Sequence, residues 1–145
     1  MTTKLYEADY YAWTQEQALL IRNEEIEKLD LSNLLEEIEA MGQRERRELT
    51  SRLIVLIMHL LKWQFQPEHC SKSWILTIRH QRIELELLLE DSPSLRREVA
   101  ERIVAAYPHA RTSAIEETGS SATLFPVECP YTVDQILDEA FFPES

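Results

Sequence analysis

The residues of this chain that are best suited to hold a metal ion are three histidines, His59, His69 and His80, with Cys70 directly after His69. Imidazole and thiolate groups are common zinc ligands, and such a site would suit a metal-dependent hydrolase. However, adjacent ligands after a proline are a weak pattern, and the sequence contains no H-E-x-x-H or Cys-x-x-Cys motif. His59 interrupts an apolar run, which is typical of a hydrogen-bonded core histidine. We therefore expect no metal and no other cofactor, and the hydrolase is the least favoured of three functional hypotheses.

Acid–base catalysis would need neighbouring carboxylates, and Glu36, Glu37 and Glu39 form the densest group. On a helix, such residues more often make up a solvated acidic face than a catalytic site. The chain has two glycines, Gly42 and Gly119, so no glycine-rich phosphate loop can be written. We assign no catalytic residue and favour a non-enzymatic interaction protein.

The formal net charge of −11 is unevenly distributed along the chain. Residues 43–82 carry eight lysines and arginines against three acids, whereas residues 1–42 carry three against ten, and residues 113–145 carry seven acids and no base. A basic patch suits nucleic acid or another phosphoanion, but the negative total opposes non-specific nucleic-acid binding. The other interpretation is that the acidic ends fold onto the basic middle. The anion-binding hypothesis rests on Arg44, Arg46, Arg47, Arg52, Arg79 and Arg82.

Helix-forming residues dominate the chain and predict an all-α fold. The proline-free region 31–66 predicts one helix about 54 Å long. After a proline-punctuated segment, Thr132 begins a short last helix. We expect a single domain, residues 1–145, in which four to five helices form a bundle around the long central one. The other helices are predicted over 6–23, 70–90, 93–107 and 109–118, the last two separated at Pro108.

The long helix has segments of different character. Its first part carries an amphipathic stripe that ends at Met41, and residues 42–48 are polar on all sides. Residues 49–61 are apolar on nearly every side, which indicates a helix surrounded by others. The buried core is predicted to contain Leu53, Leu56, Ile57, Leu60 and Trp63.

Charge is nearly antisymmetric about Gly42, with acids before it and arginines after it. A two-fold axis near Gly42 would place the acidic segment of each copy against the basic segment of the other, and a glycine would let the two backbones approach closely. This pattern favours a homodimer, or else the binding of another protein. The alternative is that Gly42 relieves a packing constraint within one chain and that the charges pair along the helix. The interface residues are Glu36, Glu39, Met41, Gly42, Arg44, Arg46 and Arg47.

The start of the chain lacks the apolar segment of a signal peptide, and the longest apolar run, 53–58, is far too short to span a membrane. Cys70 and Cys129 show no disulfide framework spacing. We therefore expect a cytoplasmic protein with free thiols and no membrane partner.

Three segments together resemble one family: Tyr6-Glu-Ala-Asp-Tyr-Tyr-Ala-Trp13, Leu34-Leu-Glu-Glu-Ile-Glu-Ala-Met-Gly42 and Met58-His-Leu-Leu-Lys-Trp63. Ser73-Trp74 and Cys129-Pro-Tyr-Thr132 add to the match. Over nearly its whole length the chain resembles the bacterial domain-of-unknown-function family number twenty-nine. The resemblance implies an all-helical bacterial domain with no settled activity. It transfers no catalytic residue, so it leaves the interaction, anion-binding and hydrolase hypotheses open.

Overall fold

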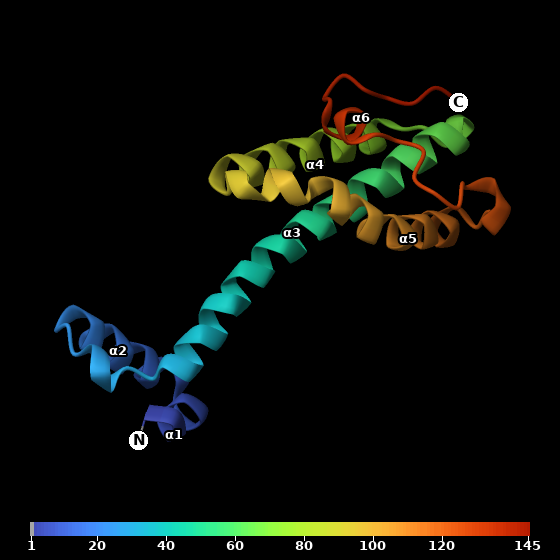
Figure 1. Ribbon diagram of the computed structural model, residues 1–145. Coiled ribbons are helices and arrows are strands. Elements are labelled where there is room, and N and C mark those ends of the chain that lie inside the picture. Colours follow the sequence, from blue (N-terminus) through green and yellow to red (C-terminus); the bar gives the residue numbers. More distant parts are fainter. Residues whose placement is uncertain (1) are drawn as a thin grey trace. The chain divides into compact units, whose positions relative to one another are not determined.

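The computed structural model describes residues 2–145, and Figure 1 shows that they form helices joined by turns and, after Thr118, a largely extended C-terminal segment, with no strand among them. This confirms the all-α prediction with a long central helix and a proline-punctuated C-terminal segment. The α-helices are α1 (Thr2–Ala8), α2 (Tyr10–Arg22), α3 (Leu31–Phe65), α4 (Lys72–Asp91), α5 (Val99–Thr118) and α6 (Val133–Leu137). Four short 3-10 helices connect them: η1 (Ile26–Lys28), η2 (Pro67–His69), η3 (Pro93–Glu98) and η4 (Ala122–Leu124).

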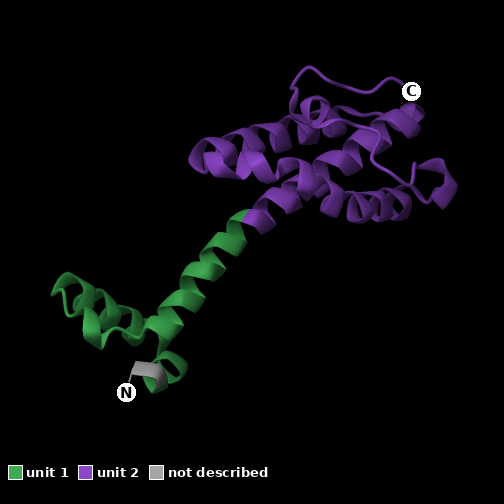
Figure 2. Cartoon of the chain, in the orientation of Figure 1, with its two compact units in different colours: residues 1–45 green, residues 46–145 purple. Residues whose placement is uncertain are grey.

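The chain divides into two compact units, residues 1–45 and 46–145, and the boundary falls inside α3 (Figure 2). The first unit contains α1, α2, η1 and the first half of α3. The second contains the rest of α3 and all later elements. The expectation of one domain over 1–145 stays a prediction.

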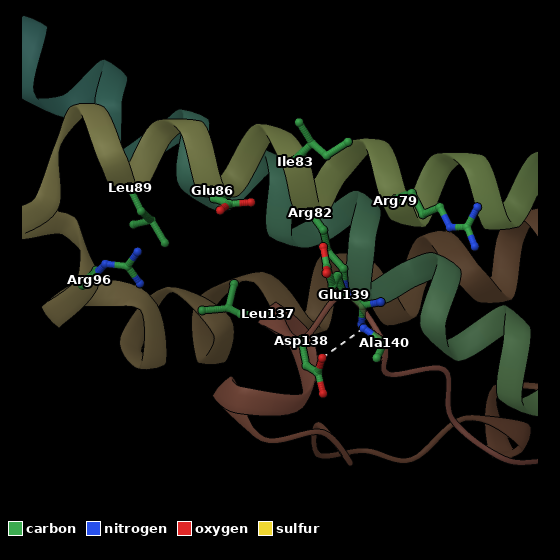
Figure 3. Close-up of a pocket in the computed structure, with 10 residues that line it drawn as sticks. All are labelled: Arg79, Arg82, Ile83, Glu86, Leu89, Arg96, Leu137, Asp138, Glu139 and Ala140. Carbon is green, nitrogen blue, oxygen red and sulfur yellow. Dashed lines mark hydrogen bonds between the residues drawn. The ribbon is translucent and has the colours of Figure 1, made fainter.

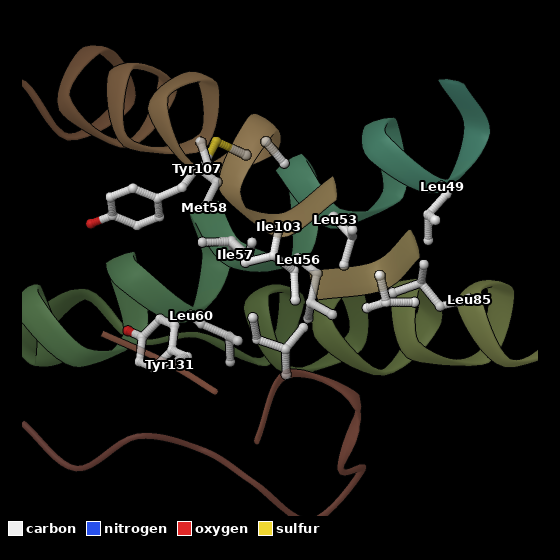
Figure 4. Close-up of a cluster of buried hydrophobic side chains, with 14 of the residues drawn as sticks. Leu49, Leu53, Leu56, Ile57, Met58, Leu60, Leu85, Ile103, Tyr107 and Tyr131 are labelled. Carbon is white, nitrogen blue, oxygen red and sulfur yellow. The ribbon is translucent and has the colours of Figure 1, made fainter. Parts of the chain in front are cut away.

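In unit 2 the second half of α3 is the centre of the hydrophobic core, as predicted. Leu53, Leu56, Ile57 and Leu60 are fully buried, and they pack with side chains of α4 and α5 (Figure 4). Trp63, which was predicted to be buried, is only partly buried, and its ring centroid lies 5.1 Å from that of Phe142 in the C-terminal segment. The run 49–61 is apolar on nearly every side because neighbouring elements cover it from several directions.

Two boundaries differ from the prediction. The helix expected over 6–23 is interrupted at Asp9, whose side chain accepts a 3.0 Å hydrogen bond from the Ala12 amide and starts α2 as its N-cap. The break expected at Pro108 does not occur, and α5 continues through it. Proline has no backbone N–H, so the carbonyl of Val104, four residues earlier, lacks its usual helical donor. Both Pro108 and Val104 are exposed, so water can hydrogen-bond to that carbonyl. Val104 is 75% exposed.

Local caps end α5 and begin α6, and the predicted start of the last helix at Thr132 is confirmed. Gly119 ends α5 in the left-handed conformation with a φ of 67°, which glycine adopts without a steric penalty. Thr132 and Gln135 form a reciprocal capping box at the start of α6: the Thr132 hydroxyl accepts from the Gln135 amide at 3.1 Å, and the Gln135 side chain accepts from the Thr132 amide at 3.0 Å. These caps position the C-terminal segment on the core, where it buries Phe125, Tyr131 and Ile136.

Candidate functional site

The first half of α3 carries a row of large apolar side chains that face solvent. Leu31, Leu35, Ile38 and Met41 are 65%, 58%, 62% and 52% exposed. Their spacing of three to four residues places them along one side of the helix. Single exposed apolar residues are ordinary, but a contiguous row on one helix side is typical of an interaction surface. We call these four residues the apolar row.

The opposite side of this half-helix is held in place by a buried polar network. Asp30, which precedes α3, accepts a 3.0 Å hydrogen bond from Trp13 Nε1 and a 2.7 Å bond from Asn33 Nδ2. Its other carboxylate oxygen accepts from the Asn33 amide at 3.4 Å, and its own amide donates to Gln17 Oε1 at 2.8 Å. Burial alone would raise the pKa of Asp30, but the hydrogen bonds from Asn33 and Trp13 outweigh it, so the pKa is lowered. Asp30 therefore remains a carboxylate that ties α2 to α3.

An aromatic cluster from α1 and α2 lies beside Glu37. Tyr6 donates a 2.7 Å hydrogen bond to Glu37 Oε1, and its ring centroid lies 4.7 Å from that of Trp13. Because the hydrogen bond favours the protonated phenol, the pKa of Tyr6 rises to about 12, and the same bond lowers the pKa of Glu37. The Glu37 carboxylate also raises the pKa of Tyr10. Glu37 thus belongs to the fold of unit 1 and is not free to meet a binding partner.

The predicted interface residues lie at the surface. Glu36, Glu39, Arg44 and Arg47 are exposed. Arg46 is also exposed but pairs with Glu98 at the end of η3, with 2.7 Å between Arg46 Nε and Glu98 Oε1. These charged side chains, before and after Gly42 on the same helix, are therefore exposed to solvent.

Gly42 lies on the same half-helix, and nothing in the described residues explains it. A β-carbon built on Gly42 would meet no atom within 4 Å. The idea that Gly42 relieves a packing constraint within one chain is therefore wrong, because there is no neighbour to be relieved. A glycine inside a helix costs about 1 kcal/mol relative to alanine.

The arginines of the anion-binding hypothesis do not form a free cluster. Arg82 is buried and donates to the carbonyls of Ile136, Phe141 and Gln135 at 2.9, 2.8 and 3.2 Å. Its burial lowers its pKa, and its donors are used to hold the C-terminal segment. Arg52 contacts Gln81 at 3.4 Å and two carboxylates, Glu48 and Glu84, at 3.4 and 3.5 Å.

Arg79 is exposed beside an open groove of about 750 Å³ in unit 2 (Figure 3). Arg82 and Arg96 also line this groove, but so do three acids, Glu86, Asp138 and Glu139. The mixed charge gives a phosphate group no net attraction over the groove as a whole. The apolar part of its lining comes from Ile83, Leu89, Leu137 and Ala140.

The histidines of the hydrolase hypothesis do not assemble into a metal centre. His59 is half-buried and its Nδ1 lies 2.8 Å from the Val55 carbonyl, which makes Nδ1 the protonated nitrogen. Burial lowers the pKa of His59, so the ring is held neutral. His69 and His80 are exposed. Across residues 2–145, no group of three or more His, Cys, Asp or Glu side chains is arranged to hold a metal ion.

Cys70 and Cys129 are free thiols, as predicted. Burial raises the pKa of both, so neither thiol is activated as a nucleophile. Among the described helices, none is long and apolar enough to cross a lipid bilayer.

The family comparison agrees with this arrangement. The family model described as "Domain of unknown function DUF29" matches residues 5–142, and the chain belongs to that family. No curated protein and no solved structure matches this chain. The description of the family names no activity.

Sequence reasoning missed the buried network around Asp30, and the charged interface residues stay a prediction. The available signal was local: Asp30 stands just before the long helix with Asn33 three residues later, a spacing that allows an N-cap. The contact from Trp13 spans 17 residues of sequence and has no periodic signature.

Proposed function

We propose that this chain is a non-enzymatic cytoplasmic protein that acts by binding another protein chain through the first half of α3. The observation that carries the proposal is the apolar row, in which four large side chains along one helix side are each more than half exposed. Covering such a row removes apolar area from water, at roughly 25 cal/mol for each Å². The surrounding Glu36, Glu39, Arg44 and Arg47 would form the polar rim that such interfaces have.

Helix-on-helix docking is the recognition mode that this surface fits best. Apolar residues at three- and four-residue spacing bind in a groove of a partner, or pack against another helix whose side chains fit between them. Because the buried Asp30 network and the aromatic cluster fix the opposite side of α3, the row is presented on a preformed surface. A preformed surface loses little conformational entropy on binding, which favours affinity.

Nucleic-acid or phosphoanion binding through residues 43–82 remains the weaker alternative. Arg82 donates its hydrogen bonds to the C-terminal segment, and Arg52 forms ion pairs with two carboxylates. A phosphate-binding surface would have to rely on Arg44, Arg47 and Arg79, in a chain of net charge −11. Retardation of DNA or RNA at low salt that disappears as salt rises would support this alternative over the first.

The proposal is tested by recovering bound proteins from the source cells with tagged wild type, Ile38→Glu and Val104→Glu. Ile38 and Val104 are both exposed apolar residues, at 62% and 75%, so both variants should fold and each adds one negative charge. We expect bound protein, whether further copies of this chain or a different chain, to be lost with Ile38→Glu and retained with Val104→Glu. Equal recovery with all three proteins would refute a role for the apolar row.

A further inference from the structure

We infer that the chain bound by the apolar row is a second copy of this protein, antiparallel to the first, with a two-fold axis that crosses α3 at Gly42. This inference rests on the proposed function, because it names the partner of the same surface. It is carried by the order of the exposed charges along the helix, by their position around the helix, and by Gly42 itself.

The order of charges fits an antiparallel pair. Glu36 and Glu39 stand six and three residues before Gly42, and Arg46 and Arg47 stand four and five residues after it. At a rise of about 1.5 Å per residue, Glu39 and Arg46 are about 4.5 and 6 Å from the axis, and Glu36 and Arg47 about 9 and 7.5 Å. Each acid of one copy therefore lies opposite an arginine of the other to within about 1.5 Å along the helix. In a parallel pair, each residue would face the same residue of the other copy, so acids would lie opposite acids.

The same four charges lie on one side of the helix. At about 100° per residue, the four charges fall within about 100° of the circumference: Arg46 and Glu39 lie about 40° and 60° from Gly42, and Glu36 and Arg47 lie about 120° and 140° from it on the same flank. A two-fold axis perpendicular to a helix brings the same flank of both copies together. The acids and arginines are therefore placed to meet across the axis, with Ile38 and Met41 providing the apolar contact beside them.

Gly42 supplies an independent argument for a close crossing at this point. It is a poor helix former in the interior of a long helix, and a side chain there would touch nothing within 4 Å. Because it lacks a side chain, a second backbone can approach closely where the two helices cross. Ile38 and Met41 of each copy would then pack over the glycine of the other.

The required charges are available. Glu36, Glu39 and Arg47 are exposed, and the described residues show no hydrogen bond or ion pair to them. Arg46 pairs with Glu98, but its side chain is 55% exposed and a guanidinium has further N–H donors. An interface centred on one helix crossing is small, so we expect a weak dimer with a dissociation constant in the micromolar range, on the order of 10 µM.

The test is a charge exchange at Glu36 and Arg47, because neither side chain has a hydrogen bond or an ion pair to the described residues that the exchange would break. Sedimentation velocity over a range of protein concentrations is measured for wild type, Glu36→Arg, Arg47→Glu and the double variant. Each single variant places like charges opposite each other twice in the dimer, so we expect its dissociation constant to rise at least about tenfold. The double variant restores opposite charges and has the wild-type net charge, so it should dimerise as the wild type does.

Two controls make the outcome specific. Glu116→Arg, at an exposed position of α5, changes the net charge as Glu36→Arg does and should leave the dimer unchanged. A mixture of Glu36→Arg with Arg47→Glu should form a heterodimer, because both charge pairs are then complementary.

A wild type that remains monomeric at several hundred micromolar would overturn the second-copy inference. The proposed function would survive that result if Ile38→Glu still lost a different bound protein while Val104→Glu kept it. A wild-type dimer that neither single charge variant weakens would overturn the antiparallel arrangement. If Ile38→Glu also leaves that dimer intact, the apolar row is not part of the dimer interface.

Discussion

Trp13 Nε1 donates a 3.0 Å hydrogen bond to Asp30 Oδ2, and both side chains are buried, at 2% and 7% exposure. A carboxylate in this position must keep its hydrogen bonds, because an unpaired buried charge is costly. The two residues join α2 to the beginning of α3 across a turn of the chain. The apolar row on the far side of α3 is therefore held in place by a contact that contains none of its residues.

Replacing Asp30 by alanine should destabilise unit 1 by about 2–4 kcal/mol, because the change removes an N-cap and leaves the donors of Trp13 and Asn33 unpaired. Asp30→Asn keeps a carbonyl acceptor and should cost less. Glu27→Ala, an exposed neighbour in η1, should change stability by less than about 0.5 kcal/mol. Hydrogen exchange of the α2 amides measures the effect locally. Unchanged protection in Asp30→Ala would show that the network does not hold α2.

The lowered pKa of Asp30 predicts a pH dependence. Because the folded pKa lies below the unfolded value of about 3.9, the carboxylate contributes stability that is fully present above that pH and is lost as pH falls through the folded pKa. Asp30→Asn resembles the protonated acid and lacks this contribution. The difference in urea-unfolding free energy between wild type and Asp30→Asn should therefore shrink between pH 6 and pH 3. A difference that stays constant over that range would contradict the prediction.

The core of unit 2 gives a second stability prediction. Leu56 and Leu60 are fully buried, and Leu56→Ala or Leu60→Ala should cost about 2–5 kcal/mol because each leaves a cavity among packed side chains. Val104→Ala, on the exposed side of α5, should cost less than about 0.5 kcal/mol. Denaturant unfolding monitored by circular dichroism compares the three. Costs below about 1 kcal/mol at both leucines would mean that this half of α3 is not the centre of the core.

Arg82 predicts how the C-terminal segment is attached. Its guanidinium donates to three backbone carbonyls of that segment and lies 5.6 Å from the Phe142 ring centroid. Arg82→Lys keeps the charge but loses the planar set of donors, so it should release the segment almost as fully as Arg82→Ala. Hydrogen exchange of residues 133–142 should rise at least about tenfold in both variants, which corresponds to about 1.4 kcal/mol. Arg79→Ala, one turn earlier and exposed, is the matched control and should leave exchange unchanged.

The sequence predicts those parts of this fold whose causes are local. The second half of α3 is apolar on nearly every side, and this pattern alone identifies the core helix. Gly119 and Thr132 are likewise recognisable because a cap is decided by a few consecutive residues. The continuation of α5 through Pro108 was not predictable, since it depends on which side of the helix faces water.

Arg82 shows the same limit for the candidate site. Its spacing from Arg79 suggests a basic patch, but its hydrogen-bond partners lie 53 to 59 residues away in the chain. Helical periodicity carries no information about such partners. The charge order around Gly42, by contrast, is a property of one helix, so the sequence alone could indicate it.

Gly42 gives the prediction that best separates the monomer from the proposed dimer. Nothing lies within 4 Å of a β-carbon at this position, so Gly42→Ala should stabilise the isolated chain by about 1 kcal/mol through helix propensity. Gly42→Leu should stabilise the isolated chain by a similar amount, because leucine is also a good helix former. In the dimer, the leucine side chain would hold the two backbones apart and weaken association. Gly42→Leu should therefore raise the free energy of unfolding measured at low micromolar concentration. The same change should lower the degree of self-association measured by sedimentation at high concentration. If Gly42→Leu raises the monomer's stability and leaves self-association unchanged, the two helices do not cross at this residue.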